Sequence, residues 1–168
     1  MLTRPATPRM DVSTLLLRPA NNADVPAVKR LVFKVLREHG LRPSPHGTDA
    51  DLRDIEASYW RQGGRFDVLI DTAGRILGTV GLKPVTPTTV ELRKMYLDAR
   101  IRGLGQGRRL LAHALQEARS LGFRRVELET ASVLQQAVKL YERAGFRRFV
   151  SASLATRCDA AFALDLSP

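Results

Sequence analysis

The sequence predicts a mixed α/β fold built on one twisted, mixed β-sheet of about six to seven strands, with helices on both faces. Short apolar runs and amphipathic stretches alternate in the order β-α-α-β-β-β-α-β-α-β-β. The stretch Asp71–Gly74 separates two apolar runs and has the composition of a hairpin turn, which predicts antiparallel neighbours. The strand–helix–strand unit over residues 90–130 predicts a parallel pair joined by a right-handed crossover. The sheet should therefore contain both kinds of pairing.

The first third of the chain predicts one strand and two helices. Residues 15–19 form a short strand that ends at a proline. Asn21 has the position of an N-cap for the next helix, whose apolar residues recur every three or four positions until Gly40. Thr48 and Asp51 have the spacing of a capping box, and they predict the start of a second helix.

The rest of the chain predicts six more strands and two more helices. The strands are expected at residues 66–70, 76–82, 90–97, 125–130, 146–150 and 160–166. One helix runs from Gly105 to Leu121, and Ser132 and Gln135 form a capping box for the other, which ends at Gly145. The residues expected to face the core are Leu111, Leu115, Ala118 and Leu121 in the first helix and Val133, Ala137, Leu140 and Tyr141 in the second.

Length and composition limit the class of protein. A chain of 168 residues with 44% hydrophobic and 26% charged residues is typical of one globular domain, expected over residues 13–168 after a flexible tail over residues 1–12. No apolar run is long enough for a membrane span, and the first residues lack the apolar stretch of a secretory signal. The single cysteine, Cys158, fits a reducing compartment. We therefore expect a cytoplasmic protein without a membrane partner.

The formal net charge of +10 has two interpretations. It could attract an anionic partner such as RNA, or it could reflect a solvated, arginine-rich surface. The arginines are scattered apart from a cluster at residues 100–109, and aromatic side chains that would stack on bases do not alternate with them. A nucleic-acid partner is therefore disfavoured.

The run over residues 100–111 is the main functional motif. Its glycines, at positions 103, 105 and 107, let the backbone approach a ligand closely, and the helix that begins there directs free N–H groups at the same point. These features predict a site for a phosphate-bearing ligand. The positive charges expected around it are those of Arg102, Arg108 and Arg109.

Three phosphate-binding patterns can be compared with this run. A P-loop requires Lys and Ser or Thr after its last glycine, and Arg108–Arg109 occupies that place. A dinucleotide-binding loop requires G-x-G-x-x-G, whereas these glycines fall as G-x-G-x-G, and the acidic residue at the expected distance, Glu127, lies inside a strand. The third pattern, Q/R-x-x-G-x-G/A, is met by Arg102, Gly105 and Gly107. A simple tight turn at a helix start is the alternative.

The third pattern is the pyrophosphate-binding loop of the GNAT superfamily of N-acetyltransferases, and the chain resembles this family over about residues 15–166. Four segments in the family's order carry the resemblance: LLLRPA at 15–20, GTVGL at 78–82, residues 91–109, and residues 127–146, which end in A-x-x-L-Y-x-x-x-G-F. The resemblance implies a GNAT-type sheet whose splayed strand pair holds acetyl-CoA. It also implies acetyl transfer from acetyl-CoA, as cosubstrate, to an amine in a ternary complex.

The resemblance also implies roles for individual residues. Main-chain groups of Met95, Tyr96 and Leu97 would pair with the pantetheine arm, and the N–H of Leu97 would polarise the acyl carbonyl. Many members carry an asparagine at the position of Leu134, and Gln135 or Gln136 would have to replace its contact. The residues whose N–H groups would wrap the pyrophosphate are Arg102, Gly103, Leu104, Gly105, Gln106, Gly107 and Arg108.

Two residues are candidates for catalysis. Tyr141 occupies the tyrosine of the family's last motif and would protonate the departing thiolate; the alternative is an aromatic core residue. Glu91 lies eleven residues before Arg102, like the base of the histone-acetylating branch; the alternative is a surface glutamate paired with an arginine. Acetyl transfer requires no covalent nucleophile, so Cys158 needs no catalytic role. No spacing of ligand residues indicates a metal.

The acceptor is expected to contact residues 46–59, with Glu91 and Arg93 at the floor of the cleft. Asp49 and Asp51 would meet an amine there, or they would only cap a helix. The carboxylates suit a cationic acceptor and Arg93 suits a carboxylate-bearing one, so neither is preferred. The expected function is an N-acetyltransferase acting on a small-molecule or peptide amine. The alternatives are a noncatalytic acyl-CoA-binding module and, less favoured, a basic nucleic-acid-binding domain, and a homodimer is left open.

Overall fold

The computed structural model describes residues 9–167 and contains one seven-stranded mixed sheet. The strands lie in the order β1-β2-β3-β4-β5-β7-β6, and only β4 and β5 are parallel among the described pairs. This confirms the predicted fold class. The strands are β1 (Leu16–Pro19), β2 (Arg65–Ile70), β3 (Ile76–Pro84), β4 (Thr89–Leu97), β5 (Arg125–Thr130), β6 (Arg147–Phe149) and β7 (Ala160–Asp165).

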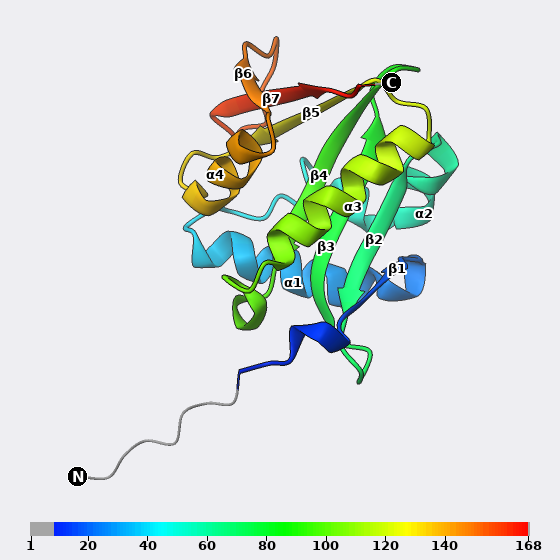
Figure 1. Ribbon diagram of the computed structural model, residues 1–168, viewed down its shortest axis with the longest axis vertical. Coiled ribbons are helices and arrows are strands. Elements are labelled where there is room, and N and C mark those ends of the chain that lie inside the picture. Colours follow the sequence, from blue (N-terminus) through cyan, green and yellow to red (C-terminus); the bar gives the residue numbers. More distant parts are fainter. Residues whose placement is uncertain (1–8, 168) are drawn as a thin grey trace, which may run out of the picture.

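Four α-helices and several 3-10 turns connect the strands. The α-helices are α1 (Val25–Glu38), α2 (Ile55–Ser58), α3 (Gln106–Ser120) and α4 (Gln135–Arg143). The 3-10 turns are η1 (Val12–Thr14), η2 (Asn22–Asp24), η3 (Ala50–Arg53), η4 (Trp60–Gln62) and η5 (Ala99–Ile101). Figure 1 shows α3 in front of the sheet, across β3 and β4, and α1 behind it. Helices therefore cover both faces, as the sequence predicts.

Two apolar cores hold the helices on the sheet. Behind the sheet, Val28, Val32 and Leu36 of α1 are buried against Ile55 and other residues of the segment around α2. In front, the apolar face of α3 is buried against β3, β4 and β5. Residues three or four apart in a helix, and alternate residues in a strand, face the same core, so the 3.6- and 2.0-residue periods of the sequence are both satisfied.

Several helix starts differ from the predicted ones. Asn21 is an N-cap as predicted, but of the 3-10 turn η2 that leads into α1: its side chain accepts from the Ala23 N–H, and the Asp24 carboxylate accepts from the Asn21 N–H. The two predicted capping boxes are wrong. Asp54 caps α2 instead of Thr48. The Ser132 hydroxyl donates to Asp159, so α4 begins at Gln135 without a side-chain cap. At Ser132 a distant partner replaced the local one, whereas at α2 the cap is local but lies six residues after Thr48.

The predicted core-facing sets also need two corrections. Leu121 and Val133 were expected to be buried, yet they are 45% and 51% exposed, because each lies beyond the end of its helix. Leu110 and Ala114 take the buried places on α3 instead. The expected tail lies mostly in residues 1–8, outside the described residues, while Met10 and Val12 pack against the front core. The division into a tail and one domain over residues 13–168 stays a prediction.

The sheet opens between β4 and β5, and this opening positions the site. The two strands pair only at Thr89–Glu91 of β4, opposite residues 125–127 of β5. Beyond that point β4 stays paired with β3, where the register shifts between Thr79 and Gly81. Lys94, in the shifted stretch, has a φ of 53°. An irregularity of this kind bends a strand away from its neighbour, so the splayed strand pair is present.

Candidate active site

A cleft of about 1230 Å³ occupies the opening between β4 and β5. Its walls come from the second half of β4, the start of α3, the face of α4 and the loop that precedes β7. The cleft brings together most of the residues that the sequence singled out, which lie up to 50 positions apart. Those that line it are Glu91, Met95, Tyr96, Leu97, Arg102, Gly103, Gly105, Gly107, Arg108 and Tyr141.

The glycine-rich loop forms one end of the cleft. Gly103 and Gly105 have φ values of +71° and +80°, a region that L side chains rarely adopt, and a Cβ at either position would meet no protein atom within 4 Å. Gly105 is the N-cap of α3 and provides no side-chain cap, so N–H groups of the first turn are left for a ligand. Gln106 is buried and Leu104 half-buried, and neither side chain lines the cleft.

The arginines of this loop are less free than the sequence suggests. The Arg102 guanidinium donates to the Leu97 carbonyl at 3.0 Å and pairs with Glu38 at 2.6 Å. Arg109 donates to the Leu15 carbonyl at 3.0 Å. Arg108 is exposed and lines the cleft. The side chains of Arg102 and Arg109 therefore also hold the loop to the rest of the fold, and their contact with a ligand stays a prediction.

The free edge of β4 faces the cleft with its main chain. Asp98 N–H donates to the Leu77 carbonyl on β3 at 2.8 Å. Because main-chain groups of successive strand residues point to opposite edges, the N–H groups of Leu97 and Met95 point away from β3, toward the cleft. No described strand pairs with that edge beyond Glu91. This part of β4 can therefore accept an extended ligand as an added strand.

Tyr141 lies on α4. Its side chain is almost completely buried, and the small part that is exposed lines the cleft. The ring packs on Phe146 and Phe162 at centroid distances of 5.8 and 6.5 Å. Its hydroxyl has no hydrogen-bond partner within residues 9–167, and burial raises its pKa well above the ordinary value. The side chain is thus both a core aromatic and a protonated hydroxyl at the cleft, so the two interpretations do not exclude each other.

Glu91 lies where β4 and β5 separate. Burial raises the pKa of its carboxyl, the nearby carboxylate of Glu129 raises it further, and Arg93 opposes the shift from 3.5 Å. Glu129, which the sequence did not single out, lines the cleft from β5 and accepts from the Ala155 N–H at 3.0 Å.

The acceptor-side aspartates neither cap a helix nor line the cleft. Asp49 is completely buried; it accepts from Arg157 through both oxygens at 2.7 Å and pairs with Lys94 at 2.8 Å. Asp51 accepts from the Tyr59 hydroxyl and pairs with Arg93 at 3.2 Å. The capping interpretation is therefore wrong, and to meet an amine these two carboxylates would have to leave a buried network of ion pairs.

We expect Asp49→Asn to lower the free energy of unfolding by about 3–5 kcal/mol, because it leaves buried cations without their partner. Arg157, Lys94 and the Ser44 N–H hold the pKa of Asp49 well below the ordinary aspartate value. A lowered folded-state pKa stabilises above the unfolded pKa of about 4, and that contribution is lost as the pH falls below it. Urea unfolding of both proteins at pH 7 and pH 3 measures the difference.

Asp165→Asn is the matched control, since its exposed carboxylate also pairs with an arginine, Arg125, at 3.0 Å. An exposed pair contributes about 0–1 kcal/mol. Equal unfolding free energies for Asp49→Asn and this control at pH 7 would contradict the importance of the buried network.

Of the three histidines, only His39 lines the cleft. The Nε2 of His113 lies 2.9 Å from Asp67 on β2, outside the cleft lining. His39 lines the cleft, and its Nδ1 lies 3.0 Å from the Val35 carbonyl. Within the described residues no group of His, Cys, Asp and Glu could hold a metal, and no helix is long and apolar enough to cross a membrane.

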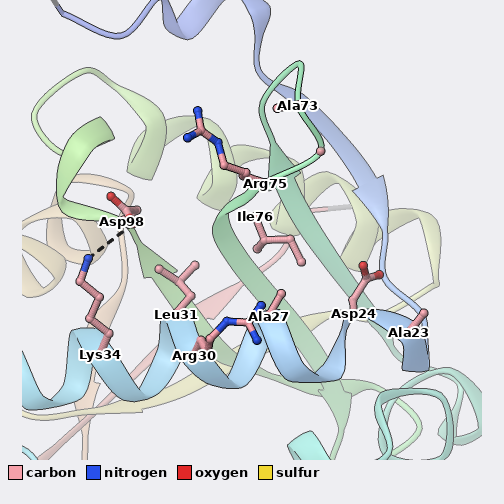
Figure 2. A pocket seen from close by; sticks show the side chains of 11 residues that line it. Ala23, Asp24, Ala27, Arg30, Leu31, Lys34, Ala73, Arg75, Ile76 and Asp98 are labelled. Atoms are coloured by element: carbon pink, nitrogen blue, oxygen red, sulfur yellow. Dashed lines mark ion pairs between the residues drawn. The ribbon is translucent and has the colours of Figure 1, made fainter.

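A second hollow, of about 410 Å³, lies between α1 and the β2–β3 turn and shares no residue with the cleft. Figure 2 shows Arg30 and Lys34 of α1 along one side and Arg75 of the turn above it. Lys34 lies 3.8 Å from Asp98, whose pKa Arg100 lowers to about 2. None of the residues expected to be functional lines this hollow, so the cleft is the candidate site.

Comparison with known proteins places this geometry in a family. The sequence profile described as "Acetyltransferase (GNAT) family" matches residues 33–146. The "Uncharacterized N-acetyltransferase YjgM" of Escherichia coli (strain K12) is 35% identical over 136 residues, covering 78% of this chain and 81% of that protein.

Solved structures share the whole fold. An acetyltransferase of the GNAT family from Staphylococcus aureus Mu50 superposes with a TM-score of 0.85 at 21% identity, covering 91% of this chain and 99% of that one. A GNAT superfamily phosphinothricin acetyltransferase from Sinorhizobium meliloti, solved in complex with AcCoA, gives 0.71 at 20% identity, covering 91% and 89%. With its profile match, its sequence relative and its splayed sheet, this chain belongs to the GNAT family of acetyltransferases.

Proposed function

We propose that this protein transfers the acetyl group of acetyl-CoA to a primary amine of a small molecule or peptide, by direct attack in a ternary complex. One observation carries the proposal: a single cleft joins the glycine loop at the start of α3 to carboxylates where β4 and β5 separate. One end suits a pyrophosphate and the other an amine. A structural neighbour that binds AcCoA supports the choice of cosubstrate. A cytoplasmic location is part of the same proposal.

The residues present fit acetyl-CoA. The open space beside Gly103 and Gly105 is the space that two Cβ atoms would otherwise fill, so main-chain N–H groups there are accessible to a phosphate. The free edge of β4 offers alternate N–H and C=O groups to the amides of the pantetheine arm, in the way a strand is added to a sheet edge. Arg108 adds an exposed positive charge. Leu134, at the usual asparagine position, faces the same cleft.

The N–H of Leu97 is our candidate for polarising the acyl carbonyl. It points into the cleft, and the next peptide unit, which carries the Leu97 carbonyl, is fixed by the Arg102 guanidinium at 3.0 Å before substrate arrives. A fixed donor of this kind stabilises the charge that develops on the oxygen during attack. The same arrangement holds both reactants in line, which by itself supplies part of the rate acceleration.

Glu91 is our candidate for the base that takes the proton of the attacking amine, and Glu129 is the second candidate. Both carboxylates line the acceptor end of the cleft. The Arg93 guanidinium pairs with Asp51 and donates to the Thr48 carbonyl at 2.8 Å, so it is not free to bind a carboxylate of the acceptor. Asp49 and Asp51 are engaged outside the cleft lining, so Glu129 and Glu91, which keeps a 3.5 Å ion pair with Arg93, are the carboxylates that can meet an incoming amine.

Glu91→Gln should lower kcat/KM for the amine by about 100-fold, the lower end of general base catalysis, because Glu129 can still accept a proton through water. The raised pKa of Glu91 means that activity of the natural protein should increase with pH through a midpoint above the ordinary glutamate range. Initial rates from pH 4 to pH 9 measure this midpoint, and Glu91→Gln should remove it. An unchanged profile would transfer the role to Glu129 or to water.

A panel of amines tests the proposed function itself. The protein is incubated with acetyl-CoA and each amine, and the free CoA thiol is measured as it is released. Turnover with at least one amine is expected. Binding of acetyl-CoA without turnover of any amine would favour the alternative, a noncatalytic acyl-CoA-binding module. Failure to bind acetyl-CoA would contradict both.

A further inference from the structure

Lys94 combines an unusual backbone with a buried charge. It is the one non-glycine residue with a positive φ, 53°, within residues 9–167, and it lies in the middle of β4. A side chain in this region is disfavoured, and such a residue persists only where its surroundings hold it. The side chain is 3% exposed, although lysine is almost never fully buried without a partner.

The partners of the Lys94 ammonium all belong to one acceptor-side segment, residues 48–51. Nζ lies 2.8 Å from Asp49, 3.4 Å from Asp51 and 3.1 Å from the Thr48 carbonyl. Asp49 is in turn fixed by Arg157 from the loop before β7. The ammonium therefore ends in a cage of three oxygens on a different part of the chain.

The main chain of Lys94 is held from the other side. The Thr79 hydroxyl, on β3, donates to the Lys94 carbonyl at 2.6 Å, and Thr79 is completely buried. The register between β3 and β4 shifts next to this contact. One residue is thus fixed through its carbonyl to the sheet and through its ammonium to segment 48–51.

We propose that Lys94 is a positioning residue, whose buried ion pairs keep β4 splayed from β5 and hold segment 48–51 against the cleft. This inference rests on the proposed function, because Met95 and Leu97 directly follow Lys94 and present the edge assigned to acetyl-CoA. If the strand relaxed to regular β geometry, that edge would move toward β5 and the cleft would narrow. The β4 edge proposed for acetyl-CoA and the acceptor-side segment 48–51 would then both depend on the Lys94 side chain.

Two substitutions separate the backbone role from the charge role. Lys94→Met removes the ion pairs but keeps a side chain that disfavours positive φ. Lys94→Gly also removes the ion pairs, but glycine adopts positive φ at no steric cost. Both lose the same contacts to Asp49 and Asp51, while glycine also leaves the space of the buried stem empty, so thermal unfolding records the stability of each variant separately.

The expected results differ between the two variants. Calorimetry should show acetyl-CoA binding weakened about tenfold or more in Lys94→Met and within about threefold of the natural protein in Lys94→Gly. Hydrogen exchange in the free proteins should show altered protection of amides 92–97 in the methionine variant alone. Amides 48–53 should lose protection in both variants, because segment 48–51 has lost its anchor.

Asp67→Asn is the matched control for loss of a buried charge. Asp67 is 3% exposed and pairs with Arg65 at 2.6 Å and His113 at 2.9 Å, and none of the three lines the cleft. It should lower the melting temperature and leave acetyl-CoA affinity unchanged.

Equal exchange at amides 92–97 in the methionine and glycine variants would overturn the inference, and so would unchanged exchange at amides 48–53. These measurements need neither acetyl-CoA nor turnover. If the protein acetylated no amine, the proposed function would be refuted, but the exchange measurements would still test the structural role of Lys94.

Discussion

Replacement of Tyr141 by phenylalanine is expected to reduce kcat by about 100- to 1,000-fold, the usual cost of losing one hydrogen-bond donor to developing charge, while acetyl-CoA affinity stays within a few-fold of the natural value. The ring is retained, and with it the contacts to Phe146 and Phe162, so the buried packing should survive. Only the hydroxyl is lost. Stopped-flow detection of the free CoA thiol, under conditions where the chemical step limits turnover, measures the change.

The physical reason lies in the protonation state of the hydroxyl. Burial raises its pKa above the ordinary tyrosine value of about 10, so Tyr141 is protonated over the whole neutral range. Full transfer of that proton to a thiolate of pKa about 8.5 is unfavourable, so the main effect expected is a hydrogen bond donated to the sulfur as charge develops. Turnover unchanged by the substitution would return Tyr141 to a purely structural role.

Features set by local sequence were predicted well. The hairpin of β2 and β3 turns at residues 71–74, where Asp71 accepts from the N–H groups of Ala73 and Arg75. The start of α3 at Gly105 and the parallel crossover to β5 also follow from short segments. In each case the determining contacts lie within one element and its turn, so periodicity and turn chemistry carry the information.

Features set by distant contacts were not predicted. The sequence does not show that β7 lies between β5 and β6, because strand order depends on non-local pairing. The partner of Asp49 is Arg157, 108 positions away. Ser132 has a suitable cap position, yet its hydroxyl bonds Asp159. Polar side chains satisfied by tertiary partners look, in the sequence, like caps or solvated residues.

The candidate site divides in the same way. The glycine loop, Glu91 and Tyr141 were identified because each sits in a short motif that keeps its spacing. The loop before β7 was not, although Arg157 and Cys158 line the cleft from it. Irregular loops have no periodicity, and only the folded chain shows which part of the site they reach.

Gly105→Val is expected to weaken acetyl-CoA binding by about 100-fold or more. Gly105 has a φ of +80°, which a β-branched residue cannot adopt without strain, and its Cβ would project into the open space at the start of α3. Either the added methyl groups fill the space proposed for the pyrophosphate, or the loop relaxes and its N–H groups lose their common direction. Calorimetric titration with acetyl-CoA measures the loss.

Gly74→Val provides a closely matched control. Gly74 has a φ of +79°, its Cβ would also meet nothing within 4 Å, and it lies in the β2–β3 turn outside the cleft. Both substitutions therefore impose the same backbone strain and should lower the melting temperature by similar amounts. Only the one at position 105 places atoms where the ligand is proposed to bind. Equal acetyl-CoA affinity in the two folded variants would mean that the glycine loop shapes a tight turn and does not bind the pyrophosphate.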